Sequence, residues 1–156
     1  MIYNLFLNST TDIPLTNYYS AVLDTNRGQR VYAVDWSFLP EDTKFKVSFK
    51  FISKNASLTG ANVYNIVTNF TQPNSVSGGN EMRRYTNTIL GTVKPRMVTG
   101  TTDVQLIANP LNNDPIVLNE RPSNNLLEIK VLDFANAQYN SPLDYLMIIS
   151  FQEMKN

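Results

Sequence analysis

Strict alternation of apolar and polar residues marks one segment of the chain as a β-strand. Between Lys44 and Phe51, every second residue is Phe or Val, and the residues between them are Lys or Ser. Successive side chains of a strand point to opposite faces of a sheet, so the pattern predicts one buried and one solvated face. The buried face would carry Phe45, Val47, Phe49 and Phe51.

The segment at residues 29–36 alternates in a similar way, with Trp36 on its more apolar side. Large aromatic residues of β-sandwiches usually fill the space between the sheets. We therefore interpret Trp36 as a core residue and not as a platform for stacking a sugar. Turn-forming residues at 39–42 separate this segment from the Lys/Phe strand, so we predict that the two strands form a hairpin.

Short β-rich segments recur along the rest of the chain, at residues 2–7, 18–23, 62–70, 85–93, 104–108, 126–132 and 145–151. The last of them is almost entirely apolar, which predicts a central strand covered on both faces. Clusters rich in Asn, Gly and Pro lie between the segments, and no window repeats with the period of a helix. The pattern predicts one all-β domain over residues 1–156, an antiparallel sandwich or barrel.

Composition narrows the chemistry that such a domain can perform. The chain has no His and no Cys, and its 13 basic and 13 acidic residues give a formal net charge of zero. His is the commonest metal ligand and the side chain that titrates nearest neutrality, and Cys supplies the thiolate that acts as a nucleophile or metal ligand. We therefore expect no enzyme activity, no metal and no cofactor. A neutral chain favours self-association, and any contact with nucleic acid should be weak.

The N-terminal residues carry no basic leader before a long apolar stretch, and no run of apolar residues is long enough to cross a bilayer. We therefore expect neither a secretory signal nor membrane insertion.

Two sets of segments carry a resemblance to a known family. The first is Leu5-Phe6-Leu7-Asn8-Ser9, followed by residues 32–40 and the Lys/Phe strand; the second is Arg121-Pro122, residues 127–133 and residues 144–153. In this order they resemble the small single jelly-roll capsid proteins of large icosahedral DNA viruses and their virophages. That family includes pentons and minor capsid proteins. The resemblance rests on hydrophobic patterns, and residues 53–115 contribute little to it.

The resemblance implies that the fold is an eight-stranded antiparallel single jelly-roll sandwich. It also implies that the protein is made in the host cytoplasm and built into the virion capsid. It implies a penton, a homopentamer that closes a capsid vertex beside the major capsid protein. Two alternatives remain open, because a fold does not fix a function. One is a minor capsid protein that cements major capsid protein trimers, and the other is a lectin-like carbohydrate-binding jelly roll.

Two groups of basic residues are candidates for a subunit interface. Lys44, Lys46 and Lys50 form a stripe on the solvated face of the Lys/Phe strand, where they would meet an acidic neighbour or nucleic acid. The alternative is a plain solvated face, on which Lys also discourages aggregation. Arg83 and Arg84 follow a Ser- and Gly-rich loop and would anchor a partner carboxylate; the alternative is an ordinary surface loop.

Other motifs have simpler explanations. Residues 24–28, Asp-Thr-Asn-Arg-Gly, share two features with a calcium loop but lack its further acidic positions, so we interpret them as a tight turn. The glycosylation sequons at Asn8, Asn55 and Asn69 are expected by chance in a chain rich in Asn and Thr.

Overall fold

The computed structural model describes residues 1–9, 19–22, 29–54, 63–70, 88–97, 104–108, 114–132 and 144–155. They form ten strands and one short 3-10 helix, which confirms the all-β prediction. The strands are β1 (Ile2–Asn8), β2 (Tyr19–Val22), β3 (Gln29–Val34), β4 (Phe45–Lys54), β5 (Tyr64–Thr68), β6 (Thr88–Met97), β7 (Val104–Ala108), β8 (Ile116–Leu118), β9 (Leu126–Leu132) and β10 (Asp144–Glu153); the helix is η1 (Trp36–Phe38).

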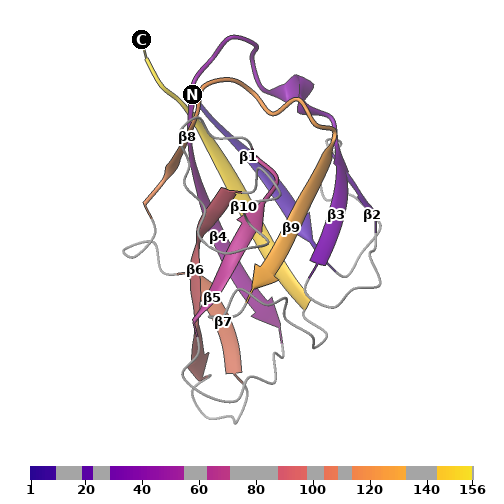
Figure 1. Cartoon of the computed structure of the whole chain (residues 1–156), viewed down its shortest axis with the longest axis vertical. Helices are drawn as coiled ribbons and strands as arrows, with labels where there is room; N and C mark the ends of the chain where they lie inside the picture. The colour runs from indigo at the N-terminus through magenta and orange to yellow at the C-terminus, as the bar shows by residue number, and fades with distance from the viewer. Residues whose placement is uncertain are drawn as a thin grey trace.

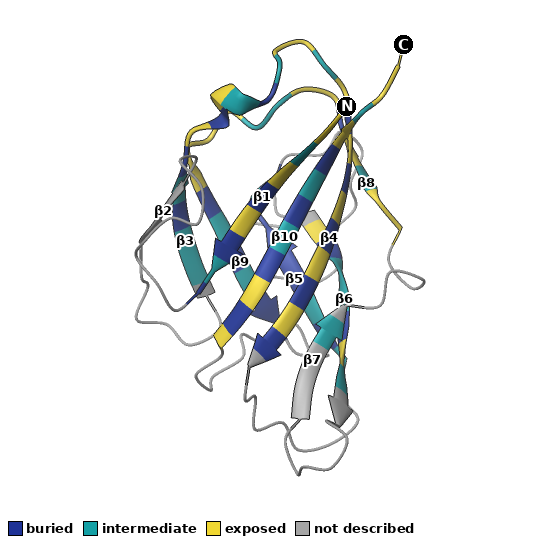
Figure 2. Ribbon diagram, turned by 180° about the vertical axis from the view of Figure 1, so that it is seen from behind, coloured by how far each residue is buried: buried dark blue, intermediate teal, exposed yellow. Residues whose placement is uncertain are grey.

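The strands pair antiparallel in the order β1-β10-β4-β7-β6-β5-β9-β3-β2, with β8 also paired to β4. The hydrogen-bonded sheet folds over on itself into two layers. Strands β1, β10 and β4 form one layer, and β5, β9 and β3 form the other, which lies in front in Figure 1 and behind in Figure 2. This confirms the antiparallel sandwich.

The strand order divides at the β6–β7 pairing into β1-β10-β4-β7 and β6-β5-β9-β3-β2. The chain passes from one half to the other repeatedly: β1 is in the first half, β3 in the second, β4 in the first, β5 and β6 in the second, β7 in the first, β9 in the second and β10 in the first. The described strands therefore alternate between the two halves along the chain. The described part of the chain has ten strands, two more than the eight that we expected.

The predicted hairpin between residues 29–36 and 44–51 is wrong. Strand β3 pairs with β2 and β9, whereas β4 pairs with β10, β7 and β8. The reason lies in the connection after β3: Trp36 lies in η1 and not in the predicted strand, and both Trp36 and Leu39 are buried in the core. A connection that buries two large side chains carries the chain from one layer across to the other and is no tight turn.

Two further predictions need correction. Strand β10 is central in its layer, but it is covered on one face only, since the Leu146 side chain is 50% exposed. Strand β8 was not predicted, because it is only three residues long and follows directly after Pro115.

The alternation that predicted the strands is the alternation that builds the core. In the first layer Leu5 lies opposite Ile149, and Ile149 lies opposite Phe49, and all three side chains are buried. In the second layer Tyr32 lies opposite Leu127 in the same way. Figure 2 shows the resulting alternation of buried and exposed residues along β1, β10 and β4.

Phe151 of β10 is the centre of an aromatic cluster between the layers. Its ring centroid lies 5.9 Å from that of Trp36, 6.0 Å from that of Phe70 and 6.2 Å from that of Phe45. The planes meet at 69° to 88°, the edge-on arrangement that aromatic quadrupoles favour. Because Phe45 and Phe70 belong to opposite layers, Phe151 joins the two sheets and the η1 connection.

A pair of tyrosines joins the layers at a second place. The Tyr32 hydroxyl of β3 donates a hydrogen bond to the Tyr145 hydroxyl of β10, at 3.0 Å. Burial raises the pKa of Tyr145 well above its usual value, so the hydroxyl stays protonated. The backbone N–H of Tyr145 also donates to Ser9 Oγ at 2.8 Å, which fixes the end of β1 beside β10.

We predict that Phe151→Ala lowers the free energy of unfolding by about 3 to 5 kcal/mol, because it leaves a cavity between the rings of Trp36, Phe38, Phe45 and Phe70. Urea titration followed by tryptophan fluorescence measures this loss. Ile89→Ala is the matched control: Ile89 is on β6, in the other half of the sheet, and is 37% exposed, so the loss should stay below about 1 kcal/mol. Equal losses for the two variants would contradict the assignment of Phe151 as the central core residue.

Candidate functional site

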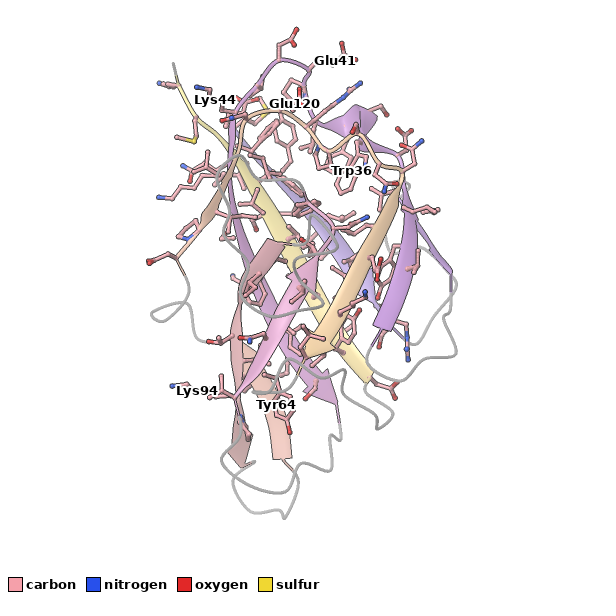
Figure 3. The ribbon with its side chains drawn as sticks, in the orientation of Figure 1. Trp36, Glu41, Lys44, Tyr64, Lys94 and Glu120 are labelled. Carbon is pink, nitrogen blue, oxygen red and sulfur yellow. The ribbon has the colours of Figure 1, made fainter. Side chains whose placement is uncertain are left out.

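Two connections meet at one end of the sandwich and enclose a pair of hollows. One connection joins β3 to β4 and contains η1; the other joins β8 to β9 (Figure 3). The first hollow has a volume of about 330 Å³ and is lined by Trp36, Asn69, Phe70 and residues 118–124. The second, of about 390 Å³, is lined by residues 35–37, 41–42, 120–123 and 125. Trp36 and residues 120–123 line both hollows, so they form the wall between them.

Trp36 ties the two connections together. Its indole Nε1 donates a hydrogen bond to the Asn124 carbonyl at 2.7 Å, and the Val34 N–H donates to the Asn125 carbonyl at 2.8 Å. The Trp36 side chain is only 4% exposed. The prediction that it belongs to the core is confirmed, and its ring offers little surface on which a sugar could stack.

Arg121 makes a second tie between the same connections. Its guanidinium donates to the Leu39 carbonyl at 3.3 Å and forms an ion pair with Glu41. Planar guanidinium groups suit such multiple contacts. The positive charge of Arg121 is therefore already engaged by a carboxylate of its own chain.

Asn69 lines the first hollow and is hydrogen-bonded to strand β9. Its Nδ2 donates to the Leu126 carbonyl at 2.6 Å, and its Oδ1 accepts a hydrogen bond from the Glu128 N–H at 3.1 Å. The side-chain amide thus bridges two residues of β9. Our sequence reasoning saw this residue only as a chance glycosylation sequon. A glycan on Nδ2 would replace a hydrogen on the atom that holds β9.

Carboxylates surround the two hollows. Asp35, Glu41, Asp42 and Glu120 are exposed there, and we call these four residues the acidic end. Arg121 is the one basic residue among the described residues that line the hollows. A hydrogen bond from the Ser37 N–H, at 2.9 Å, lowers the pKa of Asp35, with a smaller contribution from Arg121. Within the described part of the chain, no three acidic residues gather closely enough to hold a metal ion.

The structure places the predicted lysine stripe as expected. Lys46 and Lys50 of β4, and Lys44 just before it, are all exposed on the solvated side of the strand. Arg83 and Arg84 lie outside the described residues, as do the turn at 24–28 and the sequon at Asn55.

An exposed apolar patch lies on the same side of the first layer, and sequence reasoning missed it. Leu146 of β10 pairs with Ile52 of β4, and the two side chains are 50% and 40% exposed. In the next row Phe6 of β1 lies opposite the half-buried Ile148. We call this side of β1, β10 and β4 the outer face. The apolar residues at 146 and 148 were the available signal, but they suggested a strand buried on both faces.

A polar cluster joins the first and last strands. The Tyr3 hydroxyl donates to Glu153 Oε1 at 2.8 Å, and the Met1 amino group lies 3.3 Å from Glu153 Oε2. The hydrogen bond from Tyr3 is the main cause of a lowered pKa of Glu153, with help from the amino group. The same contact raises the pKa of Tyr3.

The described residues thus define an antiparallel β-sandwich with an acidic loop end and a basic, partly apolar outer face. Comparison of the chain with protein families, with curated proteins and with solved structures finds no match. In the described part of the chain, no helix has the length and hydropathy needed to cross a bilayer.

We predict that Asn69→Ala lowers the free energy of unfolding by about 1 to 2 kcal/mol, because β9 loses both hydrogen bonds from this side chain. Asn119→Ala is the control, since Asn119 lines the same hollow but is exposed, and it should change stability by less than about 0.5 kcal/mol. Urea denaturation measures both variants. A loss no larger than that of the control would show that the hydrogen bonds from Asn69 to β9 do not stabilise the fold.

We predict that Tyr3→Phe raises the pKa of Glu153 toward its usual value, as followed by NMR titration of the carboxyl carbon. The folded-state pKa is lowered, so the ionised group stabilises the protein above its unfolded pKa, and that stability is lost as pH falls through the folded pKa. The variant should therefore lose part of the dependence of stability on acidic pH. An unchanged pKa in Tyr3→Phe would mean that the hydrogen bond is not the main cause of the shift.

Proposed function

We propose that this protein is a structural capsid protein of an icosahedral dsDNA virus, a penton of which five copies close a capsid vertex. The strand order carries the proposal. The alternation of the chain between β1-β10-β4-β7 and β6-β5-β9-β3 is the connectivity expected of a single jelly roll, the fold implied by the family resemblance.

The surface supports a role in assembly. Large apolar side chains exposed together on one face are typical of interaction sites, and the outer face has such a group around Leu146 and Ile52. The formal net charge of zero removes long-range repulsion between identical copies. A heterologous contact, in which two different surfaces of the subunit meet, generates a ring when its rotation closes.

In this proposal the neighbours of the ring are major capsid protein subunits. The protein is made in the host cytoplasm, is incorporated into the virion capsid, and needs no cofactor because its role is mechanical. A minor capsid protein would use the same fold to bridge major capsid protein trimers. The carbohydrate-binding alternative has less support, because the ring of Trp36, the single Trp of the chain, is buried.

We predict that the purified protein forms a species of five times the 17.7 kDa chain mass. Size-exclusion chromatography with light scattering over a range of concentrations measures it, and negative-stain images should show closed rings. A strict monomer at every concentration would contradict the self-assembling penton. Addition of purified major capsid protein would then test the cement role, and a glycan array would test the lectin role.

A further inference from the structure

We propose that the outer face of one copy binds the acidic end of a second copy, so that the subunits join head to tail. The inference rests on the proposed self-assembly and names the two surfaces that meet. Both surfaces are built from described residues, and they differ in charge.

The register of the first layer sets the order of side chains on the outer face. One row contains Leu146 and Ile52, and the next contains Phe6, Ile148 and Lys50. Further toward the loop end, a polar row follows in which Ser150 Oγ donates to Asn4 Oδ1 at 2.7 Å. Apolar atoms therefore lie directly beside a lysine.

Lysines give the outer face its charge. Lys46 and Lys50 project from it, and Lys44 extends the row past the start of β4. None of the three belongs to an ion pair of the described residues, whose basic members are Arg121, Lys130 and the N-terminal amine. Asp144 begins β10, at the end of the face away from Lys44 and Lys46. The lysines thus have charge available for a partner.

The acidic end matches this surface in both respects. Glu41 pairs with Arg121, but Asp35, Asp42 and Glu120 take part in no ion pair of the described residues. The same two connections contain Phe38, Pro40 and Pro122, all half-buried, and Pro122 lines both hollows with Glu120. The end therefore offers apolar atoms flanked by negative charge, where the outer face offers apolar atoms flanked by positive charge.

The outer face is smaller than one side of a stable interface. Three strands spaced about 4.8 Å apart and seven residues long cover on the order of 300 to 400 Å². A stable interface needs about 800 Å² from each partner. The whole outer face, lysines included, supplies about half of that area or less, so the contact must also reach residues beside the three strands. Complementary charges then set the register and exclude wrong pairings.

A second copy fits as the partner because the neutral chain carries both surfaces. The two surfaces are different, so the contact is heterologous and each subunit can engage two neighbours. A polyanion such as nucleic acid is a weaker candidate, because three lysines neutralise few phosphates.

The test exchanges the charges of the two surfaces. Variant one, Lys46→Glu with Lys50→Glu, makes the outer face acidic; variant two, Asp42→Lys with Glu120→Lys, makes the loop end basic. Each variant alone should self-associate at least about tenfold more weakly than the wild type, because like charges then meet. The chain with all four changes should form the ring again. Light scattering at low salt measures all of them.

A mixture of the two variants gives a sharper result. Variant one has two acidic surfaces and variant two has two basic ones, so only unlike variants attract each other. They should alternate in even-numbered species and should not close a ring of five. Lys94→Glu, an exposed change on β6 of the other half, is the control and should leave the wild-type ring unchanged.

The outcomes separate this inference from the proposed function. Two results would overturn the head-to-tail contact but not the penton. One is that both double variants still form rings. The other is that the fourfold variant stays dissociated although its circular dichroism and melting temperature match those of the wild type. If a double variant does not fold, the single variant Lys50→Gln replaces it. Assembly of this variant that equals that of the wild type at every salt concentration would likewise overturn the contact. A wild-type protein that never self-associates would overturn both proposals.

Discussion

The ring of Phe151 lies where the two layers of the sandwich and the η1 connection come together, and the arrangement of the loop end depends on it. The chain has no Cys, so no disulfide can hold the layers. Edge-on contacts with Trp36, Phe70 and Phe45 do so instead. Once the Trp36 ring is fixed, its indole N–H selects the Asn124 carbonyl, and the connection between β8 and β9 is placed. The position of the acidic end thus follows from core packing.

Much of this arrangement could be predicted from the alternation of side chains. The phase of residues 45–51 correctly placed the Phe side chains inside and Lys46 and Lys50 outside, because the period of a strand leaves no other choice. The same reasoning put Trp36 in the core. It failed for the partner of that strand, since pairing between strands depends on which layer each strand joins. Proximity in sequence suggested a hairpin, but a connection with a buried Trp crosses between layers.

The candidate surfaces were harder to predict, for a related reason. The lysines were visible because charged residues on a strand face must be solvated. The apolar half of the outer face was hidden in Leu146 and Ile148, which in sequence indicate a doubly buried strand. Exposure of Leu146 depends on nothing covering that side of β10, a fact of tertiary structure. Likewise, Asn69 is hydrogen-bonded to two residues of β9 that lie 57 and 59 positions later in the sequence, and no local sequence pattern predicts these contacts.

Core packing also explains why a neutral chain can have strongly charged surfaces. Among the strand residues whose burial the structure describes, most buried positions are apolar and none is charged, so the charged residues lie on outward positions or in connections. Lys46 and Lys50 lie on β4, while Asp35, Glu41, Asp42 and Glu120 lie in the two connections that Trp36 and Arg121 hold together. Opposite charges on two neighbouring surfaces cancel in the net charge, yet they can meet when copies join. A subunit of this kind repels no distant copy, and at close range it favours the one orientation that brings unlike surfaces together.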